Sequence, residues 1–80
     1  RPGQWTIKKK QLRDYEELLD FAKEEVAADK KRIVAIRATD PDSPEIEEIN
    51  KEIELLNKGI DRYQKNIKIL TKAIHESQNS

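Results

Sequence analysis

Residues 38–44, Ala-Thr-Asp-Pro-Asp-Ser-Pro, decide the fold because they force the chain to turn at its midpoint. Proline disfavours helix at the residue before it and lacks the N–H that an intrahelical hydrogen bond needs, so Pro41 and Pro44 interrupt any helix that reaches them. Ser43 followed by Pro44 is typical of an N-cap and a first helical position. Negative charge then follows where the helix dipole favours it, from Glu45, Glu47 and Glu48. The sequence therefore predicts a turn over 39–43 and a new helix after it.

Apolar residues on both sides of this turn alternate at spacings of three and four, which is the heptad pattern of a helix that packs along one stripe. We call these positions the seam. Before the turn the seam consists of Leu12, Tyr15, Leu19, Ala22, Val26, Asp29, Ile33 and Ile36. After the turn it consists of Ile46, Ile49, Ile53, Leu56, Ile60, Tyr63, Ile67, Leu70 and Ile74. We expect helices over about 6–38 and about 44–77.

Folding the chain at the prolines brings the two seams into one consistent pairing. Ile36 meets Ile46, Leu12 meets Leu70, and every pair between them has residue numbers that add up to 82. Each pair joins an a position to a d position, as antiparallel packing requires. The sequence predicts an all-α fold: a single domain over 1–80, a two-helix antiparallel coiled-coil hairpin with arms about 50 Å long. We expect two such hairpins to dimerise into a four-helix bundle.

Asp29 is the one acidic residue in the predicted seam. A single polar seam residue commonly fixes the register of a coiled coil at some loss of stability. Alternatively, the carboxylate leans out of the seam to reach Arg32 one turn further on. We favour the second interpretation, because a short seam tolerates one leaning side chain.

A second stripe of apolar and small residues lies on one side of the seam, at the c and g heptad positions of both helices. We call it the apolar flank. Its members are Leu18, Phe21, Ala28, Ala35, Leu55, Gly59, Ile69 and Ala73. All eight fall on one face of a chain that is poor in apolar residues, whereas the opposite flank is polar. Because two helices alone bury little area, this stripe predicts a protein partner.

Charge follows a pattern of its own along the predicted hairpin. Four lysines repeat every seven residues in the second helix, at Lys51, Lys58, Lys65 and Lys72. A basic stripe can follow a phosphate backbone, but Glu47, Glu54 and Asp61 precede three of these lysines by four residues and can neutralise them. Basic residues gather at the open end and acidic ones at the tip, while the formal net charge is +0. We therefore do not expect nucleic-acid binding, and we expect Trp5 to cover the open end.

Composition excludes several classes of protein. Charged residues make up 40% of the 80 residues and hydrophobic ones 35%, so a conventional globular core is not expected. There is no cysteine, hence no disulfide or thiolate site, and the redox compartment stays open. No stretch has the length of a membrane span, so we expect a soluble, intracellular protein. The chain begins with Arg1 and lacks methionine, which suggests a processed product or an excised domain.

The predicted tip resembles that of the Gre-type transcript-cleavage factors. Asp42, Glu45 and Glu48 followed by Ile49 are similar to the acidic tip of that family, and Thr6-Ile7-Lys8 with Glu17-Leu18 is similar to its opening segment. The resemblance implies a coiled-coil finger whose acidic tip, here Asp40, Asp42, Glu45 and Glu48, enters RNA polymerase and helps to hold a metal. Ile46 and Glu47 depart from the Asn and Ala of the family, and its globular second domain is missing.

Taken together, the patterns predict a non-catalytic interaction or assembly module that self-associates or docks a partner helix through the apolar flank. The acidic-tipped finger is the alternative. We expect neither catalytic residues nor a metal site nor a cofactor, because two helices enclose no cavity of the size that a small-molecule site needs. We assign no role to the one histidine, His75.

Overall fold

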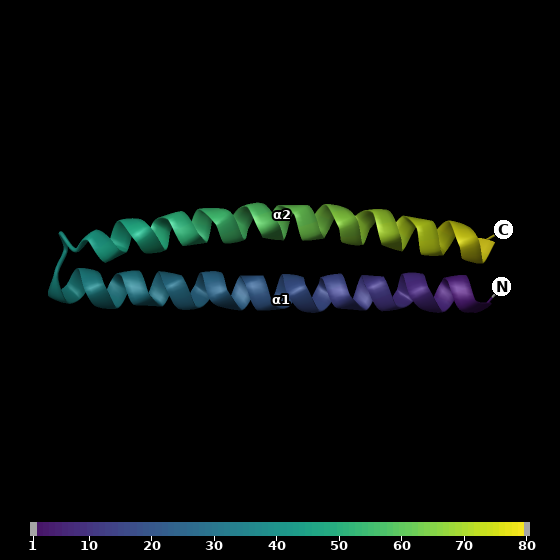
Figure 1. The fold of residues 1–80 in the computed structure, drawn as a ribbon, viewed down its shortest axis with the longest axis horizontal. Coiled ribbons are helices and arrows are strands. Elements are labelled where there is room, and N and C mark those ends of the chain that lie inside the picture. The colour runs from purple at the N-terminus through teal and green to yellow at the C-terminus, as the bar shows by residue number, and fades with distance from the viewer. Residues whose placement is uncertain (1, 80) are drawn as a thin grey trace.

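Two long helices lie side by side over almost the whole chain (Figure 1). The computed structural model describes the backbone of residues 2–79 and the side chains of residues 6–77. Helix α1 spans Pro2–Thr39 and helix α2 spans Pro44–Asn79. They run antiparallel. The start of α1 and the end of α2 lie together at one end of the hairpin, which we call the open end, and the turn lies at the other end, which we call the tip. The hairpin measures 59 × 14 × 14 Å between Cα atoms, and its all-α, extended shape was predicted.

Backbone and side-chain hydrogen bonds close the turn between the helices. The Asp40 N–H donates to the Ile36 carbonyl at 2.6 Å, and the Ser43 N–H donates to the Asp40 carbonyl at 3.1 Å. The Ser43 Oγ then accepts from the Glu45 N–H at 3.3 Å, which satisfies one of the free N–H groups at the start of α2. The predicted N-cap at Ser43 is therefore confirmed.

The observed helices are slightly longer than expected. Helix α1 begins at Pro2, four residues before the predicted start, and α2 continues to Asn79, two residues beyond the predicted end. A proline fits the first helical position because its missing N–H would have no intrahelical partner there. The side chain of Trp5, expected to cover the open end, lies outside the described residues.

Burial confirms the seam prediction. All eight seam positions of α1 and all nine of α2 are buried or half-buried. The apolar residues with the least exposure are Ala22, Val26, Ile33, Ile46 and Ile74. Because these positions alternate with exposed ones at helical spacing, one narrow stripe along each helix forms the core that the two helices share over residues 6–77.

One ring contact crosses the hairpin close to the predicted pairing. Tyr15 and Tyr63 place their ring centroids 6.2 Å apart with a 44° angle between the rings, an arrangement that aromatic pairs favour. In the predicted pairing Tyr63 lies opposite Leu19, and Tyr15 lies one turn away opposite Ile67. The two tyrosines therefore occupy neighbouring layers of the seam, where their rings can touch.

Candidate partner interface

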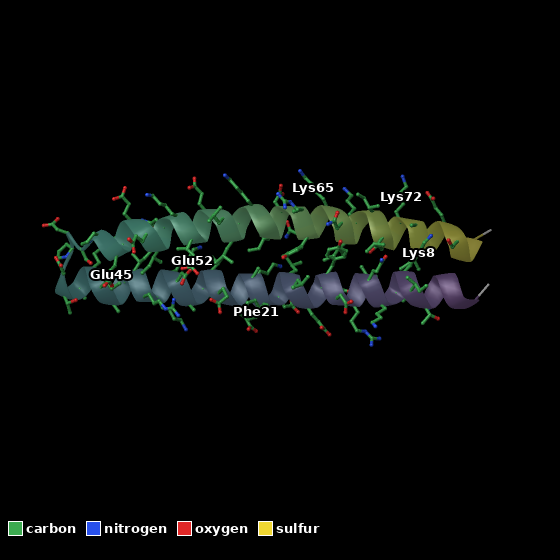
Figure 2. All side chains as sticks on the ribbon, viewed as in Figure 1. Lys8, Phe21, Glu45, Glu52, Lys65 and Lys72 are labelled. Carbon is green, nitrogen blue, oxygen red and sulfur yellow. The ribbon has the colours of Figure 1, made fainter. Side chains whose placement is uncertain are left out.

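The structure leaves the large side chains of the apolar flank uncovered. Leu18, Phe21, Leu55 and Ile69 are between 46% and 68% exposed. Figure 2 shows Phe21 near the middle of α1, far from both ends of the hairpin. Ala35 is exposed, and the remaining members, Ala28, Gly59 and Ala73, are half-buried. The two helices that share the seam thus leave this second stripe in contact with solvent.

Residues from both helices meet on the apolar flank and form a groove of about 400 Å³. Its lining consists of Leu18, Phe21, Ala22, Glu52, Leu55, Leu56, Gly59 and Tyr63. Seven of these eight are not charged, and four of them belong to the predicted interface. A partner that desolvated Phe21 and Leu55 would gain about 1.5–3 kcal/mol from each fully buried side chain.

Gly59 has no structural reason within the hairpin to be a glycine. A Cβ atom at this position would meet only the Tyr63 ring, whose Cε2 lies 4.0 Å away, an ordinary van der Waals contact. Helix α2 nevertheless carries glycine there, at a loss of roughly 0.5–1 kcal/mol relative to alanine. The missing side chain deepens the groove beside Phe21 and lets another helix approach closely.

One exposed apolar residue of this face was missed by the sequence analysis. Ile7 is 61% exposed and occupies the same heptad position as Phe21, two heptads nearer the open end. The seven-residue spacing from 7 through 21 to 35 was the signal that could have found it. Among residues 6–77, whose side chains the structure describes, six large apolar residues are exposed, and all but Val34 lie on this face.

Asp29 departs from the expected geometry. Its Oδ1 accepts from an Arg32 guanidinium N–H at 3.1 Å, which confirms the predicted pairing. However, Asp29 is 0% exposed, so the expectation that it leans out of the seam is wrong. Aspartate has a single methylene and cannot reach solvent from a seam position in the way that lysine or arginine can. Arg32 comes to the carboxylate instead, while Asp29 Oδ2 is buried without a hydrogen-bond partner.

The acidic tip residues Asp40, Asp42, Glu45 and Glu48 are all exposed. Asp40 has a structural task, because its Oδ1 accepts from the Asp42 N–H at 3.3 Å within the turn. Glu45 and Glu48 face a second groove of about 470 Å³, which Arg32, Ala35, Ile36 and Ile49 complete. The tip acids that the sequence set apart as an alternative site therefore adjoin Ala35 of the apolar flank. Across the described residues, no group of three or more His, Cys, Asp or Glu side chains is arranged to hold a metal ion.

The lysine stripe of α2 lies on exposed surface. Asp61 and Lys65 form the ion pair that the spacing predicted, with 3.4 Å between Oδ2 and Nζ. Both side chains are largely exposed, so the pair contributes little to stability. Figure 2 shows Lys65 and Lys72 extending from α2 on the side away from α1.

Neither helix, over the described residues, combines the length and apolar content that a membrane span needs. No family model, no curated protein and no solved structure matches the chain. The similarity to the Gre-type factors accordingly rests on the tip and opening residues alone.

Proposed function

We propose that this hairpin is a non-catalytic protein–protein interaction or assembly module, an antiparallel coiled coil that binds a partner through the apolar flank. The observation that carries the proposal is the exposure of Leu18, Phe21, Leu55 and Ile69 on one face, at 46–68% of each side chain. Contiguous exposed apolar surface of this kind marks interaction sites in soluble proteins. A partner hairpin on this face would complete a four-helix bundle.

The small residues of the flank support a helical partner. Gly59 and Ala73 are half-buried positions with little or no side chain, and each follows a large apolar residue of the flank, Leu55 or Ile69, by four positions. A helix that packs here can place its own side chains over these gaps, as ridges fit into grooves. A flat or polar partner would leave the gaps unfilled.

A photo-crosslinking experiment tests the interaction surface in the cell that produces the chain. Phe21→p-benzoylphenylalanine should yield a discrete adduct whose partner peptide is identified by mass spectrometry. Val34→p-benzoylphenylalanine is the matched control, because Val34 is 68% exposed but lies off the flank. The adduct should disappear when Leu55→Lys is added. Equal adducts at both positions, or none at position 21, would overturn the proposal.

The acidic-tipped finger is the alternative function, supported by the exposure of Asp42, Glu45 and Glu48 at the end of a long hairpin. If the tip enters RNA polymerase, Asp42→Asn with Glu45→Gln should abolish an effect on transcript cleavage and leave the circular dichroism spectrum nearly unchanged. Leu55→Lys should have no influence on that activity. Failure to bind polymerase would remove this alternative, and the acids would then serve the helix start alone.

A further inference from the structure

Charged residues on the outward-facing lines of the two helices have opposite signs at two matching heights in the middle of the hairpin. They have the same sign at the two outer heights, where Lys10 is level with Lys72 and Lys31 is level with Lys51. In the predicted pairing, two residues of α1 and α2 lie at the same height when their numbers add up to about 82. Glu17 is level with Lys65 and Glu24 is level with Lys58, and all four are exposed. They occupy the heptad position opposite the seam, so within one hairpin they point away from each other. No contact inside a single chain can join these opposite charges.

The apolar flank shows the same relationship. In its middle part α1 carries Asp14 and Glu25, and α2 carries Arg62, whose height lies between those of the two acids. Toward the tip the signs are exchanged, because α1 carries Arg32 and α2 carries the three glutamates Glu45, Glu48 and Glu52. Opposite charges on the two helices therefore lie at the same or neighbouring heights in the middle of the hairpin and near the tip.

We infer that the occupant of the apolar flank is a second copy of this chain, packed face to face with its two-fold axis parallel to the helices. This inference rests on the proposed function. The axis places α1 of one copy against α2 of the other at equal height, with both tips at the same end. Glu17 and Glu24 then face the partner's Lys65 and the partner's Lys58 along the rim, and Arg32 faces the partner's Glu52.

The other symmetric arrangement places like charges together. A two-fold axis perpendicular to the helices would put α1 against α1 and α2 against α2, with the tips at opposite ends. Glu17 would then lie near the partner's Glu24, and Lys58 near the partner's Lys65. Lys10 would also lie near the partner's Lys31, and Lys51 near the partner's Lys72, so every outward pair would repel. With adjacent tips two of the four outward pairs attract, so the charge pattern favours that arrangement.

Side-chain sizes also match in the selected arrangement. Phe21 is nearly level with Gly59, and Leu55 with Ala28, so these two large residues of one copy face small residues of the other. The partner's Phe21 would lie over the groove that Gly59 opens. Dense packing needs such large-to-small contacts, and the predicted Ala22–Ile60 layer of the seam is another example.

The available area suffices for a stable dimer. The stripe from Ile7 to Ala35 spans 28 residues, or about 42 Å along the helix axis. Two helices side by side present a face about 20 Å wide, so each copy would bury on the order of 800 Å², the size of a standard specific interface.

Charge exchange between two variants tests the contact directly, by sedimentation at low salt. One variant carries Glu17→Lys and Glu24→Lys, and the other carries Lys58→Glu and Lys65→Glu. Each alone should dimerise roughly tenfold or more weakly than the wild-type chain, since attraction at the rim becomes repulsion. Their mixture should recover wild-type affinity. If the mixture instead bound more tightly than the wild type, the wild-type charges would be repulsive and the perpendicular axis would be correct.

Spin labels at the tip measure the orientation independently. The chain has no cysteine, so Asp42→Cys gives a single labelled site. Adjacent tips should give label distances below about 30 Å, because packed helices lie 8–10 Å apart. Opposite tips in a hairpin 59 Å long would give distances above about 40 Å and would contradict the inference.

Different results would overturn the proposed interaction module and the inference that its partner is a second copy of the chain. A monomeric chain whose position 21 crosslinks to another protein would overturn the second copy and leave the interaction module intact. A dimer that survives Phe21→Glu with Leu55→Lys would show that another surface binds, and both proposals would then be wrong. Dimerisation that requires the flank, with adjacent tips and recovery in the mixture, supports both.

Discussion

The seam and the apolar flank are built from the same kinds of residue at the same seven-residue spacing, yet the hairpin covers only one of them. Ile33 in the seam is 8% exposed, whereas Ile69 on the flank is 66% exposed. Both lie on helices that continue without interruption from the open end to the tip. The difference shows that packing within one hairpin buries one apolar stripe of each helix and leaves the other exposed. Folding needs the seam, and we assign the flank to association.

Shortening one isoleucine of the seam and one of the flank should give the largest difference between the two stripes in the free energy of unfolding. Ile33→Ala should lower the free energy of unfolding by about 2–4 kcal/mol, because it removes buried atoms and leaves a cavity. Ile69→Ala at low protein concentration should change it by less than about 0.5 kcal/mol, since the side chain is exposed in the isolated hairpin. Urea unfolding followed by circular dichroism measures both.

Protein concentration sharpens this contrast. At high micromolar concentration the proposed dimer should add to stability by mass action, so Ile69→Ala should become more destabilising while the effect of Ile33→Ala persists. Equal losses for the two variants at low concentration would show that the flank is already covered in the single hairpin.

Asp29 is the one acidic residue in the apolar seam. Replacing it should give the next largest change in the free energy of unfolding. Asp29→Leu should raise the free energy of unfolding by about 1–3 kcal/mol, because it substitutes apolar packing against Ile53 for a carboxylate that is only partly hydrogen-bonded. Chemical denaturation measures the gain. Arg32→Ala is the informative control, since it leaves the carboxylate buried without its ion pair and should destabilise the hairpin. A loss of stability in Asp29→Leu would mean that the carboxylate holds the register.

At Gly59 the informative substitution adds a side chain to the flank instead of removing one. It should give the smallest change in the free energy of unfolding. Gly59→Ala should stabilise the isolated hairpin by about 0.5–1 kcal/mol, because the new Cβ meets only an ordinary contact with Tyr63. The same substitution should weaken dimerisation, since it fills the gap that faces the partner's Phe21. Thermal melts at low concentration and sedimentation at high concentration separate the two effects. Ala73→Ser serves as a control that changes the flank without filling the groove at Gly59. If Gly59→Ala strengthened both folding and association, the glycine would have no role in close packing.

Most of the fold could be predicted from the sequence because its determinants are local or periodic. The Pro41 and Pro44 breaks, the Ser43 cap and the alternation of apolar residues each act within a few residues of the chain. The buried or half-buried state of every seam position follows from that alternation. The starting point of α1 at Pro2 was not predicted, because the sequence offers no N-cap side chain before it and proline is compatible with a first turn.

The side-chain geometry of the partner interface was harder to predict from the sequence than the fold. The sequence placed Asp29 and Arg32 one turn apart, but whether the acid moves outward or the base moves inward depends on side-chain reach in three dimensions. Ile7 is followed by three lysines, so the sequence around it does not have the apolar character of the flank, and only its exposure in the structure identifies it as a member. The groove beside Gly59 depends on side chains from both helices, so it becomes apparent only when α1 and α2 are packed together.

Light scattering on the purified chain at high micromolar concentration tests the central claim most directly. The wild-type chain and the Val34→Glu control should both have twice the mass of the 9.4 kDa monomer. Phe21→Glu with Leu55→Lys should have the monomer mass while its helix content is unchanged, because the seam residues point elsewhere. A wild-type chain that remains at 9.4 kDa, or a double variant that stays dimeric, would contradict the assignment of the apolar flank to a second copy.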